Sequence, residues 1–294
     1  MGVISSIISI IHWNVDPVIF AVGNVRIGWY GVLLATGFML AYVVLQKIAK
    51  NEHVSAEMID KFALFTCVWT VVGLRLGHCL FYDWAYFRYH ILEIFIPFVQ
   101  TPEGWVFRGY EGLASHGGTI AIILYVLYFS HKHKVNLFWL FDRIAICIPI
   151  AAALVRCGNL MNSEIIGTVT GVPWGFVFER LNGTDECCQP RHPAQLYESL
   201  VYLSLFGYQM WYYFKHAKGR IPAGRALGTA LAVIFTARFL IEFVKADQVA
   251  FEANMTLNMG QWLSIPFIVL GVICLWYSLA KKNYPAAPDF KASK

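Results

Sequence analysis

Charged residues are scarce in this chain. Only 14% of its 294 residues are Asp, Glu, Lys or Arg, whereas 58% are hydrophobic and 16% are aromatic. A soluble globular domain carries about 25% charged residues, so the composition excludes an ordinary soluble protein. It predicts an all-α, polytopic membrane protein in which residues 1–294 form one integral-membrane domain.

Other absences narrow the class further. No internal repeat is visible, which argues against the repeated architecture of many secondary transporters. The N-terminus lacks the basic leader and the small-residue cleavage site of a signal peptide. The seven cysteines show no metal-type spacing such as a pair of C-x-x-C units, so we expect no metal and no other cofactor. Two of them, Cys187 and Cys188, are adjacent in a polar loop, where a vicinal disulfide, free thiols and pairing elsewhere all stay open.

The chain contains seven apolar stretches that approach the length of about 20 residues needed to cross a bilayer. The predicted spans are 27–48, 59–81, 117–130, 137–155, 194–214, 223–244 and 260–280. The intervening segments 82–115 and 156–193 are rich in aromatic residues, Gly and Pro. We expect these two segments to form a small head of loops and short helices.

Lys and Arg predict the orientation of the chain. The loops after the first, third and fifth spans and the C-terminal end hold most of these residues, among them Lys50, Lys218 and Lys281. By the positive-inside rule the C-terminus is cytoplasmic, while the N-terminus and the head lie on the outer side. This bias accounts for the net charge of +5, and no nucleic-acid partner is needed to explain it.

A dense polar segment follows the apolar run Ile144–Val155. Arg156, Asn159 and Asn162 recur at a spacing of three, so they share one face if the helix continues, and Glu164 comes two residues later. A charge near hydrocarbon costs several kcal/mol (roughly 2.5–3.5 by insertion scales), so a functional site is the default interpretation.

Two interpretations of Arg156 follow from its chemistry. A guanidinium donates two parallel hydrogen bonds to a phosphate, which makes Arg156 a candidate phosphate ligand. Gly158 could break the helix there and expose backbone N–H groups. The structural alternative is a cluster in which Arg156 pairs with Glu164 or Asp142.

A histidine between small residues opens the third predicted span, in the element His116-Gly117-Gly118. Histidine accepts a proton near neutral pH. The two glycines allow a substrate or another helix to approach the backbone closely. A structural role for His116 is the alternative.

Other ionisable residues enter or lie within the predicted spans. Arg238 and Glu242 are four residues apart, which predicts either a structural ion pair or a second cation for an anionic ligand. His192 precedes the fifth span, and Glu198 within it needs a partner. Tyr30 at the start of the first span is either an interfacial belt residue or a contact for a lipid headgroup.

These motifs, taken in order, resemble the prolipoprotein diacylglyceryl transferase family of bacterial inner membranes. The signature Gly-Arg-x-x-Asn-Phe-x-Asn-x-Glu-x-x-Gly of that family is similar to residues 155–167, with Val155 and Leu160 in place of its Gly and Phe. Three further family elements are matched: His-Gly-Gly at 116–118, His-Pro-x-Gln-x-Tyr-Glu at 192–198 and Arg-Phe-x-x-Glu at 238–242. The family's Gly-Tyr-Gly segment before the last of these reads Phe235-Thr236-Ala237 here, so no role for a tyrosine carries over.

The resemblance implies a reaction and its partners. The diacylglyceryl group of phosphatidylglycerol would move to the thiol of the lipobox cysteine in a prolipoprotein signal peptide. A thioether would form and glycerol 1-phosphate would leave, as the first step of lipoprotein maturation. The implied location is the inner membrane, with the active site toward the periplasmic side.

We interpret the motif residues in terms of that reaction. The predicted catalytic residues are His116 as base or proton relay, with Arg156 and Arg238 as ligands of the leaving phosphate. The residues expected to contact phosphatidylglycerol are Arg156, Asn159, Asn162, Arg238, Tyr30, Gly117 and Gly118. The residues expected to support them are Glu164, Gly167, His192, Glu198 and Glu242.

Three rival functions make different predictions. A transporter or channel requires ionisable groups spread through the bilayer and symmetry between halves. Another lipid-headgroup enzyme usually needs an acidic metal cluster, or a nucleophilic histidine among basic partners. A non-catalytic lipid-binding factor differs only in lacking activity.

Overall fold

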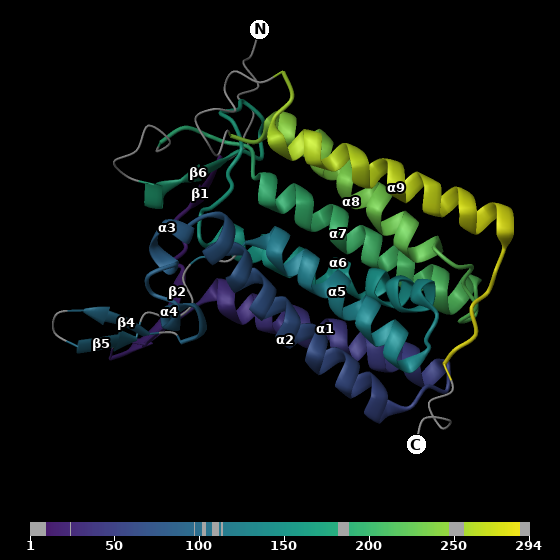
Figure 1. The fold of residues 1–294 in the computed structure, drawn as a ribbon. Helices are drawn as coiled ribbons and strands as arrows, with labels where there is room; N and C mark the ends of the chain where they lie inside the picture. The colour runs from purple at the N-terminus through teal and green to yellow at the C-terminus, as the bar shows by residue number, and fades with distance from the viewer. Residues whose placement is uncertain are drawn as a thin grey trace, which may run out of the picture. The chain divides into compact units, whose positions relative to one another are not determined.

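The computed structural model describes residues 10–23, 25–96, 98–101, 104–107, 112, 114–181, 188–246 and 256–288 (Figure 1). The long helices are α1 (Trp29–Asn51), α2 (Ala56–Phe81), α5 (Ser115–His133), α6 (Leu137–Met161), α7 (Ala194–Trp211), α8 (Arg225–Ile241) and α9 (Met259–Lys281). The short helices are α3 (Trp84–Phe87), α4 (Leu92–Phe95), the 3-10 helices η1 (Glu179–Leu181) and η3 (Glu242–Val244), and the π-helix η2 (Tyr212–His216).

Within the described residues, five helical segments are long and apolar enough to cross a membrane, which supports a multi-pass membrane protein. They are α1, α2, α6, α9 and the segment Arg225–Val244, which consists of α8 and η3. Helices α5 and α7 form where the third and fifth spans are predicted, but they are not among the five. The prediction is therefore confirmed for five spans, and the other two spans stay predictions.

Short strands are the part of the fold that the all-α prediction missed. The strands are β1 (Ile11–Trp13), β2 (Val18–Val22), β3 (Val25–Gly28), β4 (Phe98–Thr101), β5 (Gly104–Phe107) and β6 (Phe176–Phe178). They form three two-stranded sheets, with β1 parallel to β6 and antiparallel pairs β2–β3 and β4–β5. Strands of this length are too short to show a clear alternation of apolar and polar residues.

Contacts within the chain define two compact units. The first comprises Met1–Ile48 and Phe141–Pro285, and the second comprises Ala49–Leu140 and Ala286–Lys294. The sequence pattern does not indicate this division, since each unit contains predicted spans.

In the first unit, small residues let long helices approach one another closely, as Figure 1 shows for α7, α8 and α9 lying side by side. A Cβ placed on Gly228 of α8 would lie 2.8 Å from the carbonyl oxygen of Gly271 on α9. Helices α1 and α6 also approach closely at one point, where a Cβ on Gly37 would lie 3.0 Å from Cα of Ala151. Small interfacial residues are typical of helix packing in membranes.

A buried carboxylate on α6 fixes the start of α8. Asp142 is fully buried, and its two oxygens accept hydrogen bonds from the backbone N–H groups of Gly224 at 2.8 Å and Leu227 at 2.9 Å. These N–H groups have no partner within their own helix, and a negative charge there is stabilised by the helix dipole. Asp142 therefore positions the helix whose other end carries Arg238.

In the second unit, an arginine joins α4 to α2. Arg75 is buried and donates hydrogen bonds to the carbonyl oxygens of Glu93 at 2.7 Å and Ile94 at 3.3 Å. Its guanidinium also lies 4.8 Å from the ring centroid of Phe87. The Tyr86 hydroxyl donates to the Glu93 carboxylate at 2.7 Å. This arginine has a structural role in the segment between α2 and α5.

Candidate active site

Arg156 lies near the end of α6, and its side chain is only 16% exposed. Its Nε pairs with the carboxylate of Glu198 on α7, and its Nη1 donates to Asn159 Oδ1 at 3.1 Å. The pairing of Arg156 with Glu164 or Asp142, raised above as the structural alternative, is therefore wrong. The partner comes from a different helix, which spacing along α6 could not reveal.

Glu198 is one of the most deeply buried ionisable residues in the first unit, with 1% exposure. Besides Arg156 it accepts a hydrogen bond from the Tyr202 hydroxyl, one helical turn later, at 3.1 Å. A buried charge is tolerated when it is paired and hydrogen-bonded. Glu198 thus meets the need for a partner that the sequence indicated, and it holds the guanidinium of Arg156 in one orientation.

Glu164 binds the two amides rather than an arginine. Its carboxylate oxygens accept hydrogen bonds from Asn159 Nδ2 at 3.1 Å and Asn162 Nδ2 at 3.0 Å. Its backbone carbonyl accepts a hydrogen bond from the side chain of Gln195 on α7. Glu164 therefore supports Arg156 only indirectly, through Asn159.

The backbone around Glu164 is unusual. Ser163 and Ile165 have φ values of +55° and +59°, a left-handed conformation that is uncommon for residues with a side chain and an outlier for a β-branched one. Such strain persists only where surrounding contacts over-determine the backbone. Here the hydrogen bonds to Glu164 hold the turn that follows α6.

Gly158 does not break the helix, so that prediction is wrong. Helix α6 continues to Met161, and Gly158 instead makes room for Tyr30 of α1. A Cβ at this position would lie 2.9 Å from Tyr30 Cδ2. The charges of Glu164 and Arg156 act on the Tyr30 hydroxyl. Tyr30, a predicted headgroup contact, therefore lies near the polar residues at the end of α6.

Arg238 lies in the last turn of α8 and is partly buried. The predicted pair with Glu242 is wrong, because Glu242 binds Lys245, whose Nζ lies 3.1 and 3.2 Å from the two carboxylate oxygens. Within the part of the chain that the structure describes, the guanidinium of Arg238 has no ion-pair partner. Its positive charge, like that of Arg156, acts electrostatically on the Tyr202 hydroxyl.

His192 and Gly167 lie in the segment that connects α6 to α7. The imidazole Nδ1 of His192 lies 3.0 Å from the Tyr197 hydroxyl, which also accepts a hydrogen bond from Trp174 Nε1 at 2.8 Å. Partial burial lowers the pKa of His192 below its ordinary value. A Cβ on Gly167 would lie 2.5 Å from His192 Cβ, so this position has no room for a side chain.

His116 belongs to the second unit. It lies in the first turn of α5, and its side chain is exposed. Gly117 and Gly118 are buried against α2: a Cβ on Gly117 would lie 2.2 Å from the carbonyl oxygen of Gly73, and one on Gly118 would lie 2.8 Å from Leu74 Cδ2. Helix packing accounts for both glycines, and their contact with a substrate stays a prediction.

Two residues of the cluster were missed by sequence reasoning. Gln195 and Tyr202 lie on the same face of α7 as Glu198, at spacings of three and four, and all three are buried. The sequence signal that could have identified them is the row of polar side chains on one face of the otherwise apolar helix α7. Cys188 is disulfide-bonded, so it is not a free thiol. Its neighbour Cys187 lies outside the described residues.

Comparison with known proteins gives consistent matches over most of the chain. The family model described as prolipoprotein diacylglyceryl transferase matches residues 17–277. A phosphatidylglycerol–prolipoprotein diacylglyceryl transferase from Bacteroides fragilis is 43% identical over 274 residues, covering 93% of this chain and 97% of the relative. Proteins of the same name from Tolumonas auensis and Chloroherpeton thalassium are each 39% identical, covering 92% of this chain and 99% and 95% of the respective relative.

Proposed function

The chain belongs to the prolipoprotein diacylglyceryl transferase family, and we propose that its transferase reaction takes place at the cluster around Arg156. The donor is phosphatidylglycerol, and the acceptor is the thiol of the lipobox cysteine in a prolipoprotein signal peptide. The products are a diacylglyceryl thioether and glycerol 1-phosphate. This is the first step of lipoprotein maturation.

The observation that carries this assignment is that two arginines differ in their ion pairs: Arg156 has a carboxylate partner, and Arg238 has none among the described residues. Arg156 is fixed by Glu198 and Asn159, yet a guanidinium has five N–H donors, so donors remain for a phosphate. Arg238 has no carboxylate partner among the described residues, and its charge acts on the same tyrosine. A fixed cation and an unpaired one suit an anionic group that must bind, react and leave.

The proposed step breaks one bond and forms one. The lipobox thiol loses its proton, because the thiolate is the nucleophile, and His116 is the candidate base or relay. The thiolate attacks the carbon of the diacylglyceryl group that is esterified to the phosphate, and a C–S bond forms. The C–O bond breaks with its electron pair on the phosphate oxygen, and glycerol 1-phosphate departs. Arg156 and Arg238 stabilise the charge that develops there.

The finer topology is part of the proposal. Helices α5 and α7 join the five apolar helices to make seven spans, with the N-terminus periplasmic and the C-terminus cytoplasmic. The distribution of Lys and Arg supports this orientation. The segments 82–115 and 156–193 then form a head at the periplasmic surface of the bacterial inner membrane, next to the lipid headgroups.

The test is reconstitution of the purified protein with phosphatidylglycerol and a lipobox peptide. Mass spectrometry follows the thioether peptide, and a coupled assay follows glycerol 1-phosphate. Arg156→Lys keeps the charge and loses the planar fork, so we expect a large loss of product. Arg180→Lys, at an exposed pair with Asp16, is the matched control. Near wild-type activity of Arg156→Lys would rule out the proposed phosphate contact.

A further inference from the structure

A second feature of the first unit lies away from the Arg156 cluster. A groove of about 660 Å³ runs between α7, α8 and α9, which is within the range of about 300–1,000 Å³ typical of small-molecule sites. Its apolar walls include Leu200, Val201, Leu205, Val233, Leu275 and Leu279. Because exposed apolar side chains are expected throughout a membrane protein, the groove alone does not identify a ligand.

The serine and threonine hydroxyls in the groove are already bonded to their own helices. Ser204 donates to the carbonyl oxygen of Leu200 at 2.8 Å, and Thr229 donates to the carbonyl oxygen of Arg225 at 2.8 Å. These hydroxyls therefore do not require a ligand or water as hydrogen-bond acceptor. The middle of the groove suits a hydrocarbon chain.

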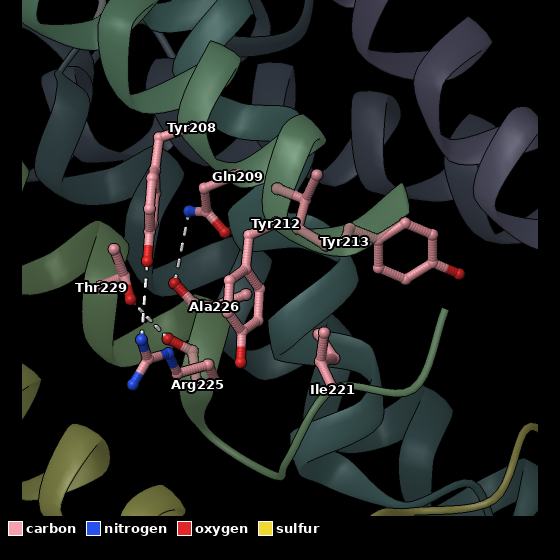
Figure 2. A pocket seen from close by; sticks show the side chains of 9 residues that line it. Tyr208, Gln209, Tyr212, Tyr213, Ile221, Arg225, Ala226 and Thr229 are labelled. Atoms are coloured by element: carbon pink, nitrogen blue, oxygen red, sulfur yellow. Dashed lines mark hydrogen bonds between the residues drawn. The ribbon is translucent and has the colours of Figure 1, made fainter. Parts of the chain in front are cut away.

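One end of the groove carries an arginine without a carboxylate. Arg225 Nη2 lies 3.5 Å from the Tyr208 hydroxyl, and its guanidinium lies 5.1 Å from the ring centroid of Tyr212. Figure 2 shows the guanidinium of Arg225 below the Tyr208 hydroxyl, with the Tyr212 ring to one side. These residues line a small cavity of about 10 Å³. In the portion of the chain that the structure describes, Arg225 forms no ion pair.

Asp142, which is bonded to the start of α8, does not form an ion pair with Arg225. Asp142 uses both carboxylate oxygens for the backbone N–H groups of Gly224 and Leu227. It compensates the N-terminal end of α8, so the positive charge that remains is that of the guanidinium. A charged group next to an apolar groove is complementary to an amphiphile with an anionic head.

We propose that this groove binds an anionic phospholipid of the surrounding bilayer. One acyl chain lies along the apolar walls, and the phosphate binds Arg225 and Tyr208. Arginine suits phosphate because its planar fork donates two parallel hydrogen bonds. A tyrosine hydroxyl that accepts a hydrogen bond from Arg225 still has its own proton to donate.

The proposed lipid site is separate from the Arg156 cluster. Arg225 begins α8 and Arg238 lies in its last turn, so the two are about 20 Å apart along the helix axis at 1.5 Å per residue. The proposal therefore does not depend on the catalytic role of Arg156 or Arg238. A lipid bound here stabilises the packing of α7, α8 and α9 without occupying the donor site.

Photo-crosslinking from inside the groove tests the proposal. A benzoylphenylalanine placed at Leu279 reports lipid bound in the groove of the full-length protein. The protein is held in micelles with equal amounts of dioleoyl phosphatidic acid and dioleoyl phosphatidylcholine, and mass spectrometry gives the ratio of crosslinked lipids. We expect phosphatidic acid to be enriched about tenfold, as for one charge-assisted contact.

Three variants separate the contributions of charge and shape. Arg225→Gln should reduce the ratio to near equality, and Arg225→Lys, which keeps the charge but loses the planar fork, should give an intermediate ratio. Arg220→Gln removes the same charge from an exposed position outside the groove, and it should leave the ratio unchanged. Equal crosslinking of both lipids in the wild type would overturn the proposal, as would full enrichment in Arg225→Gln. The wild-type ratio decides the matter even if a variant does not fold.

Discussion

Arg156 and Arg225 lie in the same unit, and both are next to tyrosines, but they have different partners. Arg156 is held by the buried carboxylate of Glu198, whereas Arg225 contacts a hydroxyl and an aromatic ring. An arginine fixed by a carboxylate is preorganised, and part of its charge is already compensated. One without a carboxylate keeps its charge for a ligand that comes from outside the chain.

Arg238 resembles Arg225 in this respect, and it resembles Arg156 in acting electrostatically on Tyr202. It has no ion pair among the described residues, yet its charge reaches the tyrosine that bonds to Glu198. The comparison implies that Arg156 variants act through both stability and activity, whereas Arg238 variants act mainly through activity. The following predictions test that difference.

The largest expected effect is that of Glu198→Gln. This change leaves Arg156 buried without a counter-charge, and breaking a buried pair in this way costs about 3–5 kcal/mol. We expect a lower unfolding temperature in detergent and a loss of transferase activity. Glu179→Gln, at an exposed contact with His12, is the control. An unchanged unfolding temperature would show that Glu198 does not hold Arg156.

The next effect is that of Arg238→Gln on the rate. Removing one preorganised donor of charge stabilisation lowers the rate by about 10²–10³-fold in other enzymes, and we expect a loss of that order. The unfolding temperature should change little, because no described residue pairs with this guanidinium. Product formation and thermal unfolding are measured on the same preparation. A drop in stability as large as that of Glu198→Gln would make Arg238 a structural residue.

A smaller effect is expected for Asp142→Asn. The amide keeps one acceptor oxygen, so one of the two backbone N–H groups at the start of α8 loses its partner. Loss of a helix cap costs about 0.5–2 kcal/mol, which thermal unfolding can detect. Asp83→Asn is a suitable control, because Asp83 precedes α3 without a side-chain cap bond. Equal unfolding temperatures for the two variants would contradict the capping role.

The smallest effect concerns His192 and pH. Its pKa in the folded protein is lowered by burial from the ordinary 6.5, so the unfolded chain binds a proton more readily. Its contribution to stability is complete above pH 6.5 and is lost as the pH falls toward the folded-state pKa. Thermal unfolding of wild type and His192→Gln between pH 5 and 8 measures the difference. A difference that stays constant across this range would refute the assignment.

The long helices and the polar segment at Arg156 were predictable, because apolar length and misplaced charge are properties of local sequence. The partner of Arg156 was not, since Glu198 lies on another helix, while Glu164 and Asp142 lie closer to Arg156 in the chain. The same holds for Glu242, which binds Lys245 rather than Arg238. Spacing along one helix indicates which residues share a face, but it does not say which pair forms.

The short strands and the loop after α6 were unpredictable for a different reason. Their shape depends on contacts made by distant segments, such as the pairing of Ile11–Trp13 with Phe176–Phe178 and the bond from Gln195 to Glu164. Left-handed φ values at Ser163 and Ile165 contradict local preference outright. Tertiary contacts decide these features, and a single sequence does not record them.

The hydrogen bonds of Asp142 also fix the point where α6 meets the start of α8. This contact joins α6 to α8 at one end, while Arg156 and Arg238 lie at the far ends of these helices, each about 20 Å away along its axis. If one helix tilted by about 5° at this contact, its far end would move by about 2 Å, and the distance between the two guanidinium groups would change by a similar amount. Hydrogen bonds remote from the proposed phosphate site thus influence the distance between its two guanidinium groups.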